Sequence, residues 1–254
     1  MILASIDERE HGFIDLIPLG DIHIGSPTSR ASEALDLISK AGSNARFLFL
    51  GDVIDNALRD SVSDTYKQTG SPGECLRGFI QLLNAAGDRL WGVVSGNHED
   101  RTTRRVGVDL LELICSEREI PYSSGMLVVD VSVGRRAPSD ERGYNYLIVA
   151  GHGSGGGRTP GGRVNAANRL ANVVPGADIY LTGHTHQPAT WKDSYFYADR
   201  HNKRIMQRDR HHLVVPAWLG YEEYAEKRFY SPSAFMEQRI FLNGAQRQIR
   251  IEIG

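Results

Sequence analysis

Five short apolar runs of this chain each stop at a glycine, and side chains able to bind a metal follow at once. The runs and their followers are "IPLG" with Asp21 and His23, "LFLG" with Asp52 and Asp55, "VVSG" with Asn97, His98 and Glu99, "LIVAG" with His152, and "IYLTG" with His184 and His186. Glycine has no Cβ, so it lets the chain turn sharply off a strand and lets other groups come close. In an open α/β sheet the carboxyl ends of the strands form the ligand crevice. We therefore expect the five clusters to meet in one site.

Each cluster taken singly also has a structural explanation. A lone Asp or His after a strand is more often a helix cap or a loop residue than a ligand. Gly-Asp is in addition a common turn signal. Five such clusters in one chain are not expected from independent capping, and this favours a functional site.

The apolar pattern predicts a layered α/β fold. Strand-like runs occur at 13–20, 45–51, 90–96, 126–133, 145–151, 178–183, 212–218 and 247–253. Helix-like segments occur at 31–42, 71–87, 108–117 and 161–174. Several runs are continuously apolar, as strands are when both faces of the sheet are covered. The alternation of strand and helix over roughly residues 10 to 190 predicts α/β layering.

The C-terminal part, about 191–254, is aromatic and charged and contains two later strand-like runs. Since no Pro/Gly/Ser-rich linker precedes it, we expect residues 1–254 to form one domain in which this part completes the sheet and the rim of the site. The two cysteines, Cys75 and Cys115, fall inside helix-like segments and are interpreted as small core residues rather than metal ligands.

Charge and hydropathy exclude two classes of protein. Lys and Arg total 29 against 31 Asp and Glu, a net charge of -2, so a strongly basic nucleic-acid-binding protein is not expected, although a local basic groove is compatible with these counts. The N-terminus lacks a basic-then-apolar leader, and no apolar run approaches the roughly 18 residues needed to cross a bilayer. We expect a cytoplasmic protein with no membrane partner.

Together the five blocks resemble the signature of the calcineurin-like metallophosphoesterase superfamily, in particular its small bacterial and phage-type members. That signature is D-x-H, G-D-x-x-D, G-N-H-[DE], a histidine after a later strand and G-H-x-H, and the match covers about residues 19–187. The resemblance implies a four-layer α/β/β/α sandwich. It also implies two metal ions, the first held by Asp21, His23 and His186, the second by Asn97, His152 and His184, with Asp52 bridging both.

The resemblance gives His98 a catalytic role at the leaving oxygen, with Asp55 orienting its ring. A helix-capping Asp55 is the alternative. An imidazole held by a carboxylate suits a general acid near neutral pH.

The residue types support the metal assignment independently. Imidazole, carboxylate and amide oxygen ligands suit divalent ions, Mn being favoured and Fe, Zn, Ni or Mg being alternatives. Two such ions roughly 3.5 to 4 Å apart can clamp a phosphoryl group and hold a bridging hydroxide for in-line attack. The sequence therefore predicts a binuclear metal-dependent phosphoesterase.

The substrate class is less constrained. Protein phosphatases of the superfamily carry a phosphate-gripping Arg directly after the second Asp of G-D-x-x-D, where this chain has Asn56. Nucleases that share the metal blocks usually place His at the position of Asp55. Expected substrate contacts are Asn97, His98, Arg101 and Arg104, the two arginines coming from "HEDRTTRR", and Arg158 in the glycine-rich stretch 151–163, which leads into a helix N-terminus.

These basic segments have structural alternatives. The first could be an exposed helix start, and the glycine-rich stretch a loop without a binding role. A further basic stretch, 199–212, is interpreted either as a solvated hairpin or as a nucleic-acid contact.

Three functions are compatible with the sequence. The favoured one is a phosphodiesterase, either a nuclease or a nucleotide phosphodiesterase. The alternative is a phosphomonoesterase acting on a small metabolite or a phosphoprotein. A non-catalytic scaffold of the same fold predicts broken ligand blocks, and none of the expected metal positions is broken here. The native metal, the physiological substrate and the oligomeric state stay open.

Overall fold

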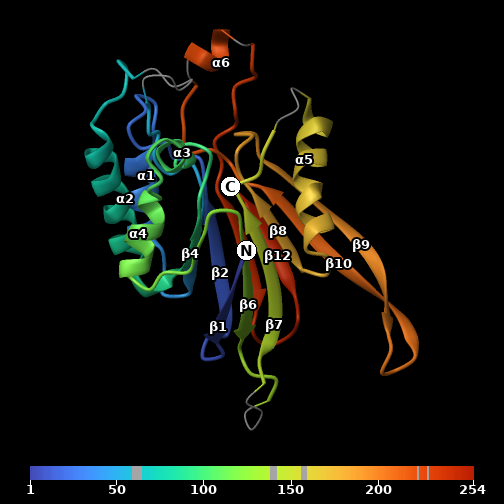
Figure 1. The fold of residues 1–254 in the computed structure, drawn as a ribbon. Helices are drawn as coiled ribbons and strands as arrows, with labels where there is room; N and C mark the ends of the chain where they lie inside the picture. Colours follow the sequence, from blue (N-terminus) through green and yellow to red (C-terminus); the bar gives the residue numbers. More distant parts are fainter. Residues whose placement is uncertain (59–64, 138–141, 156–158, 222, 228) are drawn as a thin grey trace.

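In a computed structural model of the chain, two β-sheets pack face to face and helices cover the outer face of each (Figure 1). The structure describes residues 1–58, 65–137, 142–155, 159–221, 223–227 and 229–254. The layer order is α/β/β/α, which confirms the predicted fold class.

The first sheet, called here the β2 sheet, contains the strands that carry the first three clusters. Its strand order is β12 (Ile249–Ile253), β11 (Gln238–Asn243), β2 (Phe13–Leu19), β3 (Ala45–Leu50), β4 (Leu90–Val94), β5 (Tyr122–Ser123). Strands β2, β3, β4 and β5 run parallel, and β11 is antiparallel to β2 and β12. The carboxyl ends of β2, β3 and β4 consequently lie at one edge.

The second sheet, called here the β7 sheet, carries the two remaining clusters. Its order is β1 (Ile2–Glu8), β6 (Met126–Val133), β7 (Tyr144–Gly151), β8 (Ile179–Thr182), β10 (Arg204–Val214), β9 (Ala189–Asp199). Strands β7, β8 and β10 are parallel, and β9 forms a long antiparallel hairpin with the β10 strand that follows it.

The helices divide between the two outer faces. The β2 sheet is covered by α1 (Ala31–Lys40), α2 (Pro72–Ala86) and α4 (Leu110–Glu117), while α5 (Pro160–Val173) covers the β7 sheet. Shorter helices are η1 (Gly87–Arg89), α3 (Asp100–Val106) and α6 (Glu223–Lys227). No helix within the described ranges is both long and apolar enough to span a membrane.

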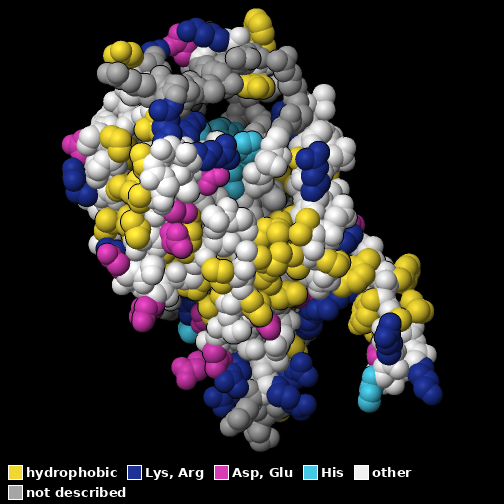
Figure 2. Space-filling view, in the orientation of Figure 1, with side chains coloured by type: hydrophobic (Ala, Val, Ile, Leu, Met, Phe, Trp, Pro, Cys, Tyr) yellow, Lys and Arg dark blue, Asp and Glu magenta, His cyan; other side chains and the backbone are white. Residues whose placement is uncertain are grey.

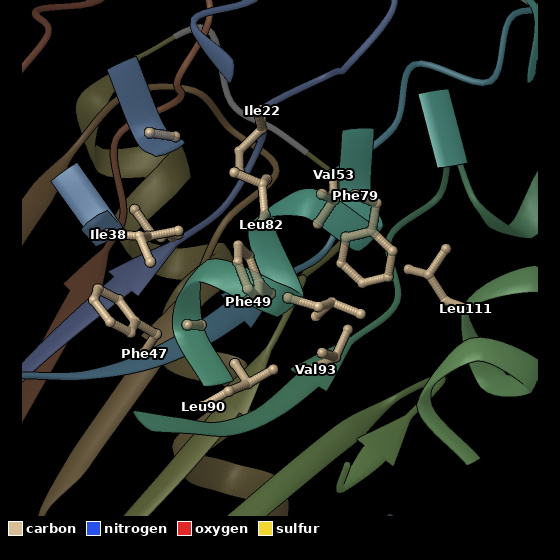
Figure 3. Close-up of a cluster of buried hydrophobic side chains, with 14 of the residues drawn as sticks. Ile22, Ile38, Phe47, Phe49, Val53, Phe79, Leu82, Leu90, Val93 and Leu111 are labelled. Carbon is tan, nitrogen blue, oxygen red and sulfur yellow. The ribbon is translucent and has the colours of Figure 1, made fainter. Parts of the chain in front are cut away.

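Strand β3 is buried on both faces, which explains its apolar run from Phe47 to Leu50. Phe47 and Phe49 point to the helices, where Phe49 packs edge-on against Phe79 of α2 at 6.0 Å between ring centres (Figure 3). Leu48 and Leu50 point the other way, into the core between the two sheets. Because side chains alternate along a strand, a strand buried on both faces needs apolar residues at every position.

Helix α2 begins and ends where its sequence predicts. The Ser71 side chain accepts from the backbone N–H of Glu74, the Glu74 carboxylate accepts from the backbone N–H of Ser71, and Pro72 occupies the first turn. This capping box satisfies two N–H groups that the helix leaves without partners. The helix ends before Gly87, whose positive φ of 53° is one that glycine adopts at low cost.

The sequence patterns missed several strands. Strands β1, β9 and β11 were not expected, and β10 begins at Arg204, eight residues before the predicted run at 212. The side chains of β9 alternate between half-buried and exposed, with burial on neither face complete. A strand of this kind has no apolar run that a sequence pattern could detect. It is defined by its antiparallel pairing with β10, to which a short turn joins it.

The C-terminal strands enter both sheets. Strands β9 and β10 extend the β7 sheet, and β11 and β12 extend the β2 sheet. The basic stretch 199–212 forms the turn and most of β10 in this hairpin, where Arg208 pairs with Asp178 at 3.1 Å and Arg210 with Asp193 at 2.6 Å.

Candidate metal centre

All five clusters predicted from the sequence meet at the carboxyl ends of their strands. Asp21 and His23 follow β2, Asp52 and Asp55 follow β3, Asn97 and His98 follow β4, His152 follows β7, and His184 and His186 follow β8. The two sheets place these ends together, as the hydrogen bond from His184 N to Asp21 Oδ2 at 2.9 Å and the 2.7 Å contact of His152 Nδ1 with the Leu50 carbonyl show.

The first ligand set is Asp21, His23 and His186. The Nε2 atoms of His23 and His186 lie 3.3 Å apart, and His186 Nε2 lies 3.2 Å from Asp21 Oδ1. Asp21 is fully buried, and His186 Nε2, although 3.2 Å from its Oδ1, is not aligned for a hydrogen bond to it. A buried carboxylate oxygen is rarely left without a partner. Three potential ligand atoms facing a common point fit a cation there.

The second set is Asn97, His152 and His184. His152 Nε2 lies 3.1 Å from Asn97 Oδ1 and 3.2 Å from His184 Nδ1. Because Nδ1 of His152 is held by the Leu50 carbonyl, Nε2 is the atom directed at the cluster. A hydrogen bond on the other ring nitrogen is the usual support of a histidine ligand.

Asp52 lies between the two sets. Its Oδ2 is 3.3 Å from His152 Nε2 and 3.8 Å from His23 Nε2. Its other oxygen, Oδ1, accepts from the backbone N–H of His98 at 2.8 Å. The bridging role that the resemblance implies for Asp52 stays a prediction.

The backbone of the site is held in an uncommon conformation. Positive φ angles occur at five of the seven predicted ligands: Asp21, His23, Asp52, His184 and His186, from 49° to 69°. Such residues cost on the order of 1–3 kcal/mol each and persist where surrounding structure fixes them. The loops also touch, since a Cβ on Gly96 would lie 2.2 Å from Asp52 Oδ1. Only glycine fits at that position.

Glu99 fixes two of these loops, a role that the sequence reasoning missed. Its buried carboxylate accepts from the backbone N–H groups of Gly96, Asp52 and Ile54 at 2.8, 2.9 and 3.0 Å. One side chain thereby joins the loop after β4 to the loop after β3. Its place as the last residue of G-N-H-E was the available signal.

His98 contacts both Asp55 and an arginine. Its Nδ1 lies 2.7 Å from the Asp55 carbonyl oxygen and 3.2 Å from the Asp55 carboxylate. Asp55 also lies 3.6 Å from His23 Nδ1, so one carboxylate faces two rings. Nη2 of Arg101 lies 2.8 Å from His98 Nε2, and since an arginine only donates, Nε2 accepts in this arrangement.

The carboxylates of the site favour positive charge around them. Burial alone would raise the pKa of Asp52, but His152 and His98 outweigh it and hold that pKa well below its usual range. Burial likewise opposes protonation of His152, and Asp52 outweighs it, raising the pKa of His152 to about 10. A histidine must be neutral to bind a metal. A divalent ion would therefore replace protons that this set of carboxylates otherwise attracts.

A pocket of about 630 Å³ opens beside the clusters, and Figure 2 shows histidines at the base of a hollow with Lys and Arg at its rim. Three of the predicted substrate contacts, Asn97, His98 and Arg101, line it. Arg104 does not line it: its exposed side chain pairs with Asp100 at 3.3 Å on the surface of α3. Arg158 lies outside the described residues. Arg163, which belongs to the same glycine-rich stretch and was also a candidate anion contact, lines the pocket, and so does Arg30, which the sequence did not indicate.

The family model for the calcineurin-like phosphoesterases matches residues 17–188, about two thirds of the chain and the whole span of the five clusters. The chain belongs to this family. Membership supports a metal-dependent phosphoester hydrolase. Among the described residues of this calcineurin-like phosphoesterase, three groups of Asp and His side chains could hold a metal ion: Asp21, His23 and His186; His23, Asp55 and His98; and Asp52, His152 and His184.

Comparisons with individual proteins are weaker. No curated protein matches the sequence. Solved structures that are similar include vacuolar protein sorting 29 from Cryptosporidium parvum, at 13% identity with 95% of this chain and 98% of that chain covered and a TM-score of 0.42. The Chaetomium thermophilum Vps29 has 11% identity, coverages of 95% and 97%, and a TM-score of 0.42. A Saccharomyces cerevisiae protein serine/threonine phosphatase with similarity to human PP5 has 12% identity, coverages of 99% and 82%, and a TM-score of 0.41.

Proposed function

We propose that the protein is a two-metal phosphodiesterase. The observation that carries this proposal is the position of Asp52 between two sets of ligand atoms, each within reach of its Oδ2. Asp21, His23 and His186 would hold one ion, and Asn97, His152 and His184 the other. When bound, such ions polarise phosphoryl oxygens and lower the pKa of water, so that hydroxide is available to attack phosphorus near neutral pH.

The chain's own residues would position the substrate and its leaving group. Arg101 lines the pocket beside His98 and presents a guanidinium suited to a phosphate oxygen. The proposed role of His98 is to donate a proton from Nε2 to the leaving oxygen. Because Nε2 accepts from Arg101 in the described state, this role requires Arg101 to turn toward the substrate phosphate.

The surroundings of Asn56 support a diester over a monoester. Its buried Nδ2 donates to the His98 carbonyl at 2.7 Å and to Thr102 Oγ1 at 2.9 Å. The position where the related protein phosphatases carry a phosphate-gripping arginine is thus occupied by a side chain engaged inside the protein. A phosphomonoester carries more negative charge than a diester, so the replacement of a phosphate-gripping arginine by a neutral side chain at this one position favours the diester.

The test compares bis(p-nitrophenyl) phosphate with p-nitrophenyl phosphate in the presence of Mn²⁺. We expect a higher kcat/KM for the diester. A higher value for the monoester would favour the phosphomonoesterase instead, and no hydrolysis of either with any divalent metal would favour the non-catalytic scaffold.

A further inference from the structure

The segment 217–235 is called here the arm, and several of its described residues line the pocket next to the proposed ligands Asp21 and His186. The arm is attached to the backbone of two proposed ligands: Trp218 N donates to the Asp21 carbonyl at 3.0 Å, and Ser233 Oγ donates to the His186 carbonyl. Gln187 Nε2 also donates to the Ser231 carbonyl at 2.7 Å. These contacts fix the described part of the arm relative to the metal ligands.

The arm presents aromatic rings to the pocket. Tyr221, Tyr230 and Phe235 line it and are 47%, 40% and 41% exposed. Phe235 packs edge-on against the buried Trp218 at 5.0 Å, and the guanidinium carbon of Arg30 lies 4.4 Å from the Phe235 ring centre. Half-exposed rings beside a polar site leave apolar surface in water, which a bound apolar group would cover.

The combination of these groups favours a flat aromatic ligand. Nucleobases stack on aromatic side chains and on arginine guanidinium groups, largely irrespective of base identity. A volume of about 630 Å³ also lies in the range of roughly 300–1,000 Å³ that is typical of small-molecule sites. Asn97 and His98 line the same pocket as the arm. A single ligand can therefore place its phosphate beside these two residues and its base on the arm.

We infer that the arm is a base-binding subsite, and that the preferred substrate is a phosphodiester carrying a nucleoside, either as a small nucleotide or at the end of a strand. Tyr221, Tyr230 and Phe235, with Arg30, would bind the base. This inference rests on the proposed phosphodiesterase function.

The test measures inhibition of bis(p-nitrophenyl) phosphate hydrolysis by two compounds that differ only in the base, adenosine 5′-monophosphate and ribose 5-phosphate. We expect adenosine 5′-monophosphate to inhibit with a Ki about tenfold lower or better, the effect of stacking one base. In Phe235→Leu and in Tyr221→Leu, the ratio of the Ki of ribose 5-phosphate to that of adenosine 5′-monophosphate should fall toward one. Phe196→Ala, which removes an exposed ring on β9, should leave the ratio unchanged.

Each outcome separates the inference from the proposed function. Equal Ki values for the two compounds in an enzyme that hydrolyses the diester would overturn the base subsite and leave the phosphodiesterase intact. Loss of all diester hydrolysis in the parent protein would instead remove the proposed function. Two leucine variants guard against one that does not fold.

A second comparison distinguishes the sources of the nucleoside. Cleavage of a dinucleotide, of a linear single-stranded oligonucleotide and of circular single-stranded DNA is followed under the same conditions. Fast cleavage of the dinucleotide alone indicates a small nucleotide, and fast cleavage of the linear strand from its end indicates strand ends. Circular DNA cleaved as fast as the other two would overturn the inference.

Discussion

Asp55 contacts the ring of His98 through two oxygen atoms, its carbonyl at 2.7 Å and its carboxylate at 3.2 Å from Nδ1. The sequence suggested a carboxylate partner for this histidine, with a helix cap as the alternative. Asp55 caps no helix among the described residues, and it faces His23 as well. The pair thus links the proposed leaving-group histidine to the first ligand set.

Replacing His98 by Ala should remove most turnover while both metal ions stay bound. Positioned acid catalysis contributes roughly 100- to 10,000-fold, and kcat for a diester should fall by that factor. Metal content by elemental analysis should be unchanged. His201→Ala, in the exposed turn between β9 and β10, is the matched control. Full activity of His98→Ala would rule out the assigned role.

The Asp52→Asn variant should lose metal as well as activity. An amide carries no negative charge and bridges two cations poorly, so elemental analysis should find fewer than two ions per chain. Asp36→Asn, on the exposed face of α1, should keep the parent content. Two ions retained in Asp52→Asn would contradict the bridging position.

Glu99→Gln should destabilise the protein without removing any ligand. The carboxylate accepts three backbone N–H groups, and an amide presents a donor to one of them. Leaving one buried donor unpaired costs about 1–3 kcal/mol, to be measured by urea unfolding. Glu112→Gln, exposed on α4, should unfold like the parent. An unchanged midpoint would mean that the two loops are held by other contacts.

Phe79→Ala should test the core beneath the site. The ring is fully buried against Phe49, and truncating a buried phenylalanine costs about 3–5 kcal/mol. Phe196→Ala, at 74% exposure, should change the free energy of unfolding by less than about 0.5 kcal/mol. Equal changes in the free energy of unfolding for the two variants would show that Phe79 contributes no more to the core than an exposed ring does.

The two cysteines should make stability fall at alkaline pH. Burial, with Asp109 nearby, raises the pKa of the Cys115 thiol from 9.0 to about 12, and burial raises that of Cys75 as well. The folded state therefore keeps protons that the unfolded state loses, so this contribution is complete below pH 9 and is lost as pH rises toward 12.

Thiol titration at pH 8 checks this point. Both buried thiols should react slowly with a disulfide reagent in the native protein and at once in urea. Cys115→Ala should flatten the alkaline loss of stability relative to the parent. Rapid native reaction of both thiols would show that they are accessible.

The chain's local patterns were sufficient to predict most of the strands and the longer helices, but not the order of the strands within each sheet. Strand β3 is apolar at each position from Phe47 to Leu50 because both faces are covered there, and that pattern is visible in the sequence. Strand β9 was missed because its side chains alternate around an exposed hairpin, where pairing with β10 rather than burial defines the strand.

The sequence by itself determined which residues are candidate metal ligands, since these side chains follow five apolar runs that each end at a glycine. Only the tertiary structure decided what surrounds them. Arg104 lies at the surface, and Glu99 accepts hydrogen bonds from three backbone N–H groups. The arm lines the pocket although it lies 30 residues or more after the last ligand block. The contacts of Glu99 with the backbone of Asp52 and Ile54, and those of the arm with Asp21 and His186, join segments distant along the chain. The local propensities and periods of a sequence carry no information about such pairings.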